Sequence, residues 1–445
     1  MDRMKRKIDQ YLIEWKNSDY KMPLIVSGAR QIGKTNAIRY FGQNNYKYYI
    51  EINFIEEDFF QDIFDEGYSV DNVMKRILFH KPLLNYEEGE TLIFFDEIQD
   101  CPNTLTSLKS FREDGRFDVI CSGSLMGLNH NEIESNSVGN KINYIMRSMD
   151  FEEFLWAKGY SSEQIDEVYS YMLELKPLPE SIFNIFSNLF KEYMVVGGMP
   201  LVLKIFIDEK TYKNVLTLQR QILLDYEEDI TKYAGGLDKT KILNVYKKIP
   251  VFLGQENKRF QISKVSNNSK NRDYVGVVDW LNNAGIINIC YELSSLSLPL
   301  KGNYVPNLYK LYFGDSGLLI GSLDDESQTD LRENNNFNIF KGAIYENVVG
   351  DMLISCGYDL FYYRNSKSTI EMDFFIRDKS SLIPIEVKAN DNATKSLNKL
   401  IKNKGYNINY GIKLCNKNIG FNGVFYTFPY FLTFLLKRYI QDTKY

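Results

Sequence analysis

Residues Gly28 to Thr35 form the run best suited to chemistry, because they match the pattern G-x-x-x-x-G-K-[ST] at every fixed position. The preceding residues 23–27 predict a short buried strand, and residues 36–41 predict the opening of a helix, which is the context this motif needs. Glycines let the backbone bend so that successive N–H groups point at phosphate oxygens, and the helix N-terminus adds partial positive charge. The run therefore predicts a phosphate-binding loop.

The residues of this loop predict binding of ATP and Mg²⁺. Lys34 is expected to reach the β- and γ-phosphates, which also gives it a catalytic role, and Thr35 is expected to hold the metal ion. The expected nucleotide-binding residues are Gly28, Ala29, Arg30, Gln31, Ile32, Gly33, Lys34, Thr35 and Asn36. A chance glycine turn is the alternative, and the complete motif with its flanking elements disfavours it.

Two carboxylates follow the apolar run of residues 91–95. A run that is apolar on both faces predicts a central parallel strand covered by helices. Asp96 then lies at its carboxyl end, where open α/β sheets bind ligands, and can hold Mg²⁺ directly or through water. Glu97 is placed to orient and polarise the attacking water. Taken without the loop upstream, an ordinary strand end with solvated acids would be the better interpretation.

A third strand is predicted from residue 117 to Ser124. A small polar residue at such a strand tip can contact the γ-phosphate or the attacking water, so Ser124 is a further candidate catalytic residue. A turn serine that caps the next segment is an equally good interpretation.

A second group of residues with chemical potential lies near the C-terminus. Glu386 and Lys388 share one face of a predicted strand because side chains alternate with a period of two. Asp373 is expected in the middle of the paired strand, and Glu346 on the preceding helix. Three converging carboxylates can bind one or two Mg²⁺ ions, and Lys388 can position water, as in metal-dependent phosphodiester cleavage. The alternative is a charged strand face in an inert domain.

Composition places the 445 residues in the class of soluble globular proteins, with 44% hydrophobic and 25% charged residues. The N-terminus does not resemble a signal peptide, and the longest apolar stretch, residues 424–436, is too short to span a bilayer. Five scattered cysteines argue against disulfides or a zinc site and favour the cytoplasm. The two histidines, His80 and His130, lack metal-ligand spacing, so histidine-based catalysis is not expected.

Charge is distributed unevenly along this chain of net charge −5. Residues 238–310 hold eleven Lys and Arg against five Asp and Glu, and residues 395–445 hold nine against one. Two basic segments in an otherwise acidic chain suggest contact with a polyanion, and DNA is the expected partner. A solvated lysine-rich surface is the alternative, and it is the favoured interpretation for either segment alone.

The elements that must position these residues fall into two patterns in the first half of the chain. Residues 1–20 predict a helix with one apolar face, formed by Ile8, Leu12, Ile13 and Trp15. Strands and helices alternate over residues 22–128, which is typical of a parallel sheet covered on both faces. Residues 151–235 predict helices alone, interrupted by a tight turn at residues 197–200.

The second half predicts two further units. Helical patterns at 242–253 and 273–283, a short element at 260–266 and a strand at 286–291 predict a winged helix. Its third helix would be the recognition helix if DNA is bound, and packing against protein is an equal alternative. A last unit is predicted from a helix at 340–356, a strand at 359–364, and an antiparallel hairpin of residues 370–376 and 381–388.

Several motifs together resemble one prokaryotic family over nearly the whole chain. These motifs are SGARQIGKT at 27–35, FDEIQ at 95–99, CSGS at 121–124, FEEFL at 151–155, GGMP at 197–200, LYFGDSGLL at 311–319 and PIEVK at 384–388. The family is that of the AAA+-type, archaeal-ATPase-like ATPases, which carry a C-terminal domain of unknown function similar to the PD-(D/E)XK nuclease fold.

The resemblance implies an α/β fold with a P-loop NTPase core (1–155), a helical lid (156–236), a winged helix (237–330) and a restriction-endonuclease-like domain (331–445). It assigns Lys34, Thr35, Asp96 and Glu97 to ATP binding and hydrolysis, places Pro200 near the nucleotide, and gives Glu346, Asp373, Glu386 and Lys388 the nuclease pattern. Residues 139–141 depart from the family, which leaves the trans-acting arginine open among Arg112, Arg116 and Arg147.

The first functional hypothesis is an ATPase that couples nucleotide state to a DNA-directed C-terminal module, with a metal-dependent nuclease as one form of that module. The alternative is a nucleotide-dependent switch or scaffold with an inactive nuclease fold that acts through protein partners. A small-molecule kinase is weaker, because the lid, winged helix and basic tail have no role in it. A homo-oligomer is expected by analogy alone.

Overall fold

The computed structural model describes residues 3–124, 139–234, 238–266, 269–324, 326–333, 338–365, 369–388 and 394–443. His130 lies outside these residues. The chain divides into two units. The first contains Met1–Arg147, Glu228–Leu237 and Asn283–Gly285, and the second contains Ser148–Glu227, Asp238–Asn282 and Ile286–Tyr445.

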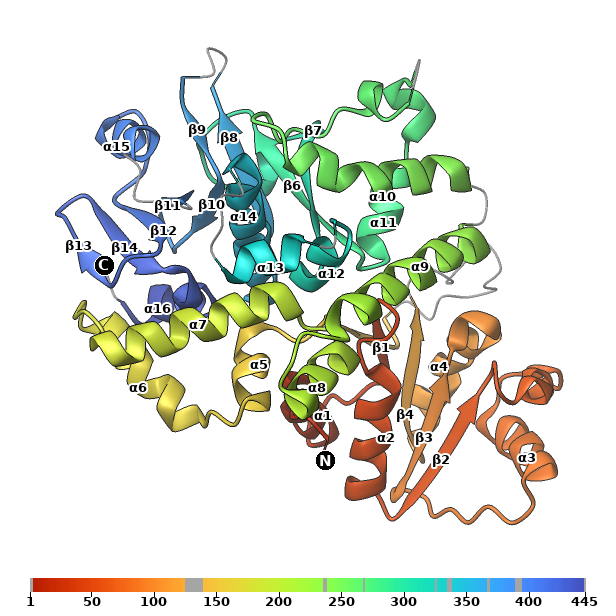
Figure 1. The fold of residues 1–445 in the computed structure, drawn as a ribbon. Coiled ribbons are helices and arrows are strands. Elements are labelled where there is room, and N and C mark those ends of the chain that lie inside the picture. Colours follow the sequence, from red (N-terminus) through yellow and green to blue (C-terminus); the bar gives the residue numbers. More distant parts are fainter. Residues whose placement is uncertain are drawn as a thin grey trace. The chain divides into compact units, whose positions relative to one another are not determined.

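The first unit is built on a five-stranded sheet in which every neighbouring pair is parallel. The strand order is β2-β3-β4-β1-β5, and β2, β3, β4 and β1 are labelled in Figure 1. The strands are β1 (Leu24–Gly28), β2 (Tyr48–Asn53), β3 (Thr91–Asp96), β4 (Asp118–Ser124) and β5 (Ile142–Ile145). The predicted parallel α/β sheet is therefore confirmed, and β3 lies inside it between β2 and β4, as its apolar character on both faces indicated.

Helices cover both faces of this sheet. They are α1 (Lys7–Lys16), α2 (Lys34–Asn45), α3 (Val70–His80) and α4 (Asn103–Asp114), with short 3₁₀ turns at Asp58–Phe64 and Ile98–Asp100. Phe95 joins a buried cluster with residues of α3 and α4. Its neighbour Phe94 points to the other face, where its ring stacks on Tyr49, which in turn lies against Gly42 of α2.

Helix α1 differs from its prediction at one position. Ile8, Leu12 and Trp15 are buried as expected, but Ile13 is exposed. Successive helical residues are about 100° apart, so Ile13 turns away from the face that the other three share.

Helices dominate the first part of the second unit, as the sequence predicted, although α8 was not foreseen. They are α5 (Phe151–Ala157), α6 (Ser162–Leu173), α7 (Glu180–Val196), α8 (Pro200–Glu209) and α9 (Val215–Tyr233), whose last residues belong to the first unit. Further along lie α10 (Lys239–Leu253), α11 (Val277–Asn283), α12 (Ser316–Gly321), α13 (Ser327–Arg332), α14 (Asn338–Ser355), α15 (Lys395–Lys402) and α16 (Leu436–Asp442). Within the described part of the chain, no helix has the length and apolar character that a membrane span requires.

The turn between α7 and α8 is fixed by buried contacts. Gly197 has φ 74°, and the N–H of Gly198 donates to Asp315 Oδ2 at 2.7 Å. A Cβ on Gly198 would lie 1.9 Å from the Met149 oxygen, so only glycine fits there. Pro200 is the first residue of α8, a position that suits proline because its missing N–H has no helical partner.

Two sheets form the rest of the second unit. One has the order β7-β6-β8-β9, with strands β6 (Ile287–Leu293), β7 (Tyr304–Phe313), β8 (Leu360–Arg364) and β9 (Glu371–Met372). The other has the order β10-β11-β12-β14-β13, with strands β10 (Phe374–Arg377), β11 (Leu382–Lys388), β12 (Gly411–Cys415), β13 (Gly420–Phe421) and β14 (Phe425–Pro429). The predicted antiparallel hairpin is present as β10 and β11.

Three details of these sheets differ from the sequence-based expectations. The predicted strand at 370–376 is broken at Asp373, which lies between β9 and β10 rather than in mid-strand. The predicted helix at 273–283 is a 3₁₀ turn followed by α11, because Gly276 has φ 78° between them. Strand β6 pairs with β8 in parallel, so one sheet crosses the boundary proposed at residue 330.

Candidate functional site

The glycine loop connects β1 to α2 as the motif predicted. Gly28 ends β1 with φ 154°, and a Cβ there would lie 2.2 Å from the Met146 oxygen. Gly33 has φ 89° and immediately precedes Lys34, the first residue of α2. Both positions require glycine, because one is closed to a side chain and the other has a left-handed backbone. The loop therefore delivers the N-terminus of α2 to the carboxyl edge of the parallel sheet.

Lys34 is buried at this edge. Its ammonium donates hydrogen bonds to the main-chain oxygens of Gly28 at 3.1 Å and of Ala29 at 2.7 Å. Burial lowers the pKa of Lys34 to about 8, although the nearby carboxylates of Glu97 and Asp96 act in the opposite direction. A buried ammonium held by neutral carbonyl oxygens is a strong candidate to pair with an anionic ligand.

Asp96 ends β3 and lies beside the loop. Its Oδ2 accepts a hydrogen bond from Thr35 Oγ1 at 2.9 Å. Its Oδ1 accepts from the Glu97 main-chain N–H at 3.0 Å and from the Ser122 hydroxyl. Burial raises the pKa of Asp96, while the bonds from Ser122 and Thr35 lower it in part. The side chains of Thr35 and Asp96 thus lie within hydrogen-bonding distance of each other at the edge of the sheet.

Glu97 stands just beyond the strand with φ 56°, a left-handed conformation that is uncommon for a residue with a side chain. Such backbone strain clusters at functional sites. Its Oε2 accepts a hydrogen bond from Gln99 Nε2 at 2.7 Å, and Gln99 Oε1 accepts one from the Ser124 N–H at 3.2 Å. Ser124 is buried at the tip of β4. The three predicted residues of the strand ends therefore lie at one edge of the sheet.

The remaining predicted loop residues take different positions. Ala29 and Ile32 are buried, whereas Asn36 is exposed and Gln31 has a left-handed backbone. Arg30 pairs with Asp229 at 3.2 Å and donates to the Tyr233 hydroxyl at 2.7 Å. Pro200 belongs to the second unit.

The second predicted site lies wholly in the second unit and is organised around Glu346 on α14. Lys310 is 2% exposed, and its ammonium lies 2.9 Å from Glu346 Oε1. The Tyr312 hydroxyl donates to the same oxygen at 2.5 Å. Lys258 donates to Glu346 Oε2. Both oxygens of the carboxylate are thus already occupied by side chains of this chain.

The other two carboxylates of this site have separate surroundings. Asp373 Oδ2 accepts the main-chain N–H of Val387 at 2.8 Å. Glu386 Oε1 lies 2.9 Å from the Lys388 ammonium, and Glu386 Oε2 is buried with no hydrogen-bond partner among the described residues. Over those same residues, no three His, Cys, Asp or Glu side chains are arranged to hold a metal ion. The predicted magnesium site of Glu346, Asp373 and Glu386 is therefore not assembled in this structure.

Electrostatics in this site are dominated by buried ion pairs. Burial alone would lower the pKa of Lys310, but the carboxylates of Glu346, Glu371 and Asp373 outweigh it and raise that pKa. Burial would raise the pKa of Glu346, but Lys258 and Lys310 lower it well below its usual range. Burial, followed by the negative charge of Glu346, raises the pKa of Asp373. Lys258 and Lys310 together offset the charge of Glu346.

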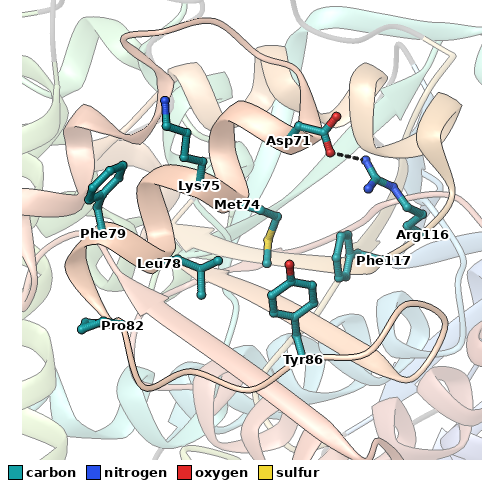
Figure 2. Close-up of a pocket in the computed structure, with 9 residues that line it drawn as sticks. All are labelled: Asp71, Met74, Lys75, Leu78, Phe79, Pro82, Tyr86, Arg116 and Phe117. Carbon is teal, nitrogen blue, oxygen red and sulfur yellow. Dashed lines mark hydrogen bonds and ion pairs between the residues drawn. The ribbon is translucent and has the colours of Figure 1, made fainter.

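In the first unit, an apolar pocket of about 500 Å³ opens at the end of the parallel sheet opposite the glycine loop (Figure 2). Phe117, which precedes β4, and Met74 and Phe79 of α3 form part of its lining. Arg116 at its wall bonds to Asp71, Glu88 and Asp114. The pocket lies at the amino ends of the strands, away from Lys34 and Asp96, and takes no part in the loop site.

Three residues at the carboxyl edge of the sheet were not predicted from the sequence: Ser122, Gln99 and Asn53. The Nδ2 atom of Asn53 lies 3.4 Å from Asp96 Oδ2. In the second unit the missed residues are Lys258, Lys310 and Tyr312. Gln99 could have been found from its place in the run FDEIQ. Ser122 and Tyr312 likewise lie in the runs CSGS and LYFGDSGLL. Asn53, Lys258 and Lys310 have no local signal, because each meets its partner only through the fold.

Comparisons with known families match three parts of the chain. Residues 20–155 match the model described as an AAA domain. Residues 187–329 and 341–431 each match a domain of unknown function, DUF8612 and DUF4143 respectively. No curated protein matches the chain. The first unit thus holds a P-loop ATPase-like AAA domain.

Among solved structures, a Walker-type ATPase of Pyrococcus abyssi, PABY2304, is 15% identical, with 72% of this chain and 96% of that chain covered and a TM-score of 0.44. The Aeropyrum pernix ORC1 protein in complex with DNA is 11% identical, with 75% of this chain and 91% of that chain covered and a TM-score of 0.28. PCH-2 of C. elegans is 13% identical, with 45% of this chain and 60% of that chain covered and a TM-score of 0.27. Because all three TM-scores are below 0.5, the assignment of the first unit rests on the AAA match and the loop geometry.

The buried charge of Lys34 predicts an unusual response to its removal. We expect Lys34→Met to raise the free energy of unfolding of the nucleotide-free protein near pH 7, by at most about 3 kcal/mol. Because the pKa of Lys34 is lower in the folded than in the unfolded state, the free-energy cost of burying its charge has its full value below pH 8. It fades as the pH rises from 8 towards 10.5, so the advantage of the variant should shrink there. Thermal melts across pH 7–10 measure this.

Lys109→Met is the matched control, since Lys109 is an exposed lysine with a 3.8 Å pair to Glu113. This substitution should change the free energy of unfolding little, and the difference from the wild type should not change with pH between 8 and 10. A wild-type protein more stable than Lys34→Met at pH 7 in the absence of nucleotide would contradict the buried-charge interpretation.

The network around Glu346 predicts a large cost for removing one lysine. Lys310→Met leaves a buried carboxylate short of one partner and should destabilise the protein by about 3 kcal/mol. Lys301→Met is the control, because Lys301 makes an exposed pair with Asp359 at 2.9 Å and should cost less than about 1 kcal/mol. Urea unfolding of both variants measures the difference. Equal midpoints would mean that the buried network does not stabilise the fold.

Proposed function

We propose that this chain binds ATP with Mg²⁺ at the glycine loop and hydrolyses it. The observation that carries the proposal is the set of groups gathered at the N-terminus of α2. A buried ammonium, Lys34, lies beside the hydrogen-bonded pair of Thr35 and Asp96. The match of residues 20–155 to an AAA domain supports it. A helix N-terminus with a buried lysine and a glycine-rich turn has the chemistry that a triphosphate requires.

Magnesium fits the residues present. The Thr35 hydroxyl and an Asp96 carboxylate oxygen are 2.9 Å apart, and hydroxyl and carboxylate oxygens are the ligands that this hard cation prefers. These two residues would hold the ion, directly or through water. When bound, it would neutralise negative charge on the β- and γ-phosphate oxygens.

The residues of the chain divide the work of hydrolysis. Lys34 places positive charge on the β- and γ-phosphates, and the N–H groups of the loop orient them. Glu97 orients and polarises the attacking water, and Ser124 contacts that water or the γ-phosphate. Pro200 remains a proposed nucleotide-binding residue on the strength of the family resemblance. The domain divisions at 155, 236 and 330 stay part of this proposal, with strands β6 and β8 pairing across the last of them.

We further propose that the second unit is directed at DNA. Helix α15 carries Lys395, Lys399 and Lys402 at a spacing that places them on one face, and all three are exposed. Leu397 and Leu400 bury the other face. A row of exposed lysines is suited to the phosphate backbone, where contacts are electrostatic and independent of sequence. ATP hydrolysis would then control this module.

A second candidate function is a nucleotide-dependent switch whose nuclease-like domain does not cut and which acts through a protein partner. The ion pairs of Lys258 and Lys310 with Glu346 favour it, because they occupy a carboxylate that a metal-dependent nuclease would need. In this reading Asp373, Glu386 and Lys388 are structural residues. The two candidates share the ATPase and differ only in the second unit.

Two variants test the ATPase. We expect Lys34→Ala to abolish ATP binding, because it removes the charge that meets the phosphates. We expect Glu97→Gln to bind ATP with Mg²⁺ normally and to lower turnover by about 10²-fold or more, because it removes the group that polarises water. Calorimetry and a phosphate-release assay measure the two steps. Normal hydrolysis by Glu97→Gln would refute its assigned role, and absence of ATP binding by the wild type would refute the proposal.

The basic face of α15 has its own test. The double charge reversal Lys399→Glu and Lys402→Glu should weaken binding of duplex DNA several-fold and reduce its salt dependence by about one unit of slope per lost phosphate contact. Fluorescence anisotropy at two salt concentrations measures this. The control is Lys204→Glu with Lys210→Glu, two exposed lysines on and after α8, which should bind as the wild type does.

The same preparations decide between the two candidates. DNA cleavage in Mg²⁺ or Mn²⁺ that is lost in Asp373→Ala or Lys388→Ala would support the nuclease. Intact DNA under both metals, with the ATPase active, would support the switch.

A further inference from the structure

Gln99 makes a set of contacts that no role assigned so far explains. Its side chain is 7% exposed and lies in the short 3₁₀ turn that follows Glu97. The amide nitrogen donates to Glu97 Oε2 at 2.7 Å and to Asp100 Oδ2 at 2.9 Å. The amide oxygen accepts the main-chain N–H of Ser124 at 3.2 Å. One buried amide therefore connects the carboxylate beyond β3 with the tip of β4.

We propose that Gln99 is the positioning residue of this ATPase: it holds the Glu97 carboxylate in place for water activation and ties it to the end of β4. The inference rests on the proposed function, because it assigns a role to a residue of the same site. Gln99 touches neither the nucleotide nor the water and acts through Glu97.

The chemistry of these contacts requires a carboxamide. Glu97 and Asp100 both need a donor, whereas the Ser124 N–H needs an acceptor. A carboxamide offers both from one rigid planar group, and a carboxylate or an ammonium offers only one kind. The length of glutamine matters too, since the group must span from the turn after β3 to the neighbouring strand.

The strand tip leaves room for this amide. A Cβ on Gly123 would lie 3.0 Å from Gln99 Oε1 and 3.0 Å from Ile98 Cγ1. A side chain at position 123 would therefore push against the amide and the turn that carries it. Glycine at this place lets Gln99 approach Ser124 without being displaced, which is a second observation independent of the hydrogen bonds.

Glu97 has particular need of such a partner. Its left-handed backbone, φ 56°, directs the side chain out of the line of the strand, and the residue is only partly buried. A carboxylate on a strained backbone keeps one rotamer only when its surroundings hold it. The bond from Gln99 supplies that restraint. A shift of Ser124 on γ-phosphate binding or release would then reach Glu97 through a single side chain.

The test compares two substitutions at Gln99 with a matched glutamine elsewhere. Gln99→Met keeps the length of the side chain and removes its donor and acceptor. Gln99→Glu keeps an acceptor for Ser124 and replaces the donor that faces Glu97 by a carboxyl group. Gln10→Met is the control, because Gln10 Nε2 donates to Glu14 Oε1 at 2.9 Å on the exposed face of α1.

We expect Gln99→Met to lower kcat about 10- to 100-fold, the usual effect of losing a partner that orients a reactive group, with ATP affinity unchanged within about twofold. Gln99→Glu should lower kcat at least as much, because it places a third carboxylate beside those of Glu97 and Asp100. Gln10→Met should match the wild type in both measurements.

The outcomes separate the inference from the function it rests on. A wild type without ATPase activity overturns the proposed function itself. An active wild type, with kcat of Gln99→Met equal to or above it, overturns the inference alone. Loss of ATP affinity in parallel with kcat in both variants would show a structural role and would also overturn it.

Discussion

A buried positive charge held by main-chain carbonyl oxygens is the feature on which the first unit depends. Lys34 donates to Gly28 and Ala29 within the loop that it ends. Burial of an ammonium without an anionic partner costs free energy, and the parallel sheet, the two glycines and helix α2 together maintain it. Carboxylates lie near enough to act on the charge but Asp96 is already bonded to Thr35 and Ser122. The positive charge of Lys34 thus lacks a hydrogen-bonded anionic partner within the loop, and a triphosphate would supply one.

The second unit treats its buried lysine in the opposite way. Lys310 is buried, as Lys34 is, but Glu346 and Glu371 lie 2.9 and 3.3 Å from its ammonium. Its charge is fully compensated within the fold, and so is that of Glu346. The two buried lysines therefore differ in their capacity to bind a ligand. Lys34 can still pair with an anion, whereas Lys310 is already paired with carboxylates of the same chain. This contrast is the physical basis for treating the first unit as the working site.

The sequence predicted what is encoded locally. The glycine loop, the strand ending in Asp96 and the helices of residues 151–235 follow from short patterns that need no partner. Ile13 was wrongly predicted to be buried. Its side chain is apolar, but its angular position around the helix turns it away from the buried face of α1. Lys258 and Lys310 could not be found, because each lies far along the chain from Glu346 and shows no pattern of its own. Tyr312 lies in the run LYFGDSGLL, but nothing in that run indicates its contact with Glu346. Asp373 was expected in mid-strand, since a single break in pairing has no signature in an apolar run.

The contact between Arg30 and the end of α9 has a practical consequence for the boundaries of the nucleotide-binding unit. Asp229 and Tyr233, which hold Arg30, come more than eighty residues after β5, which in sequence is the last strand of the sheet in the first unit. Gly285, still further along the chain, lies against Ala29. The unit is discontinuous in sequence. A fragment cut after residue 155, where the AAA match ends, would keep every motif residue and lose the segments that back the loop. Expression of that fragment would yield a domain with an uncovered surface and an unsupported loop, so biochemical work needs the full chain.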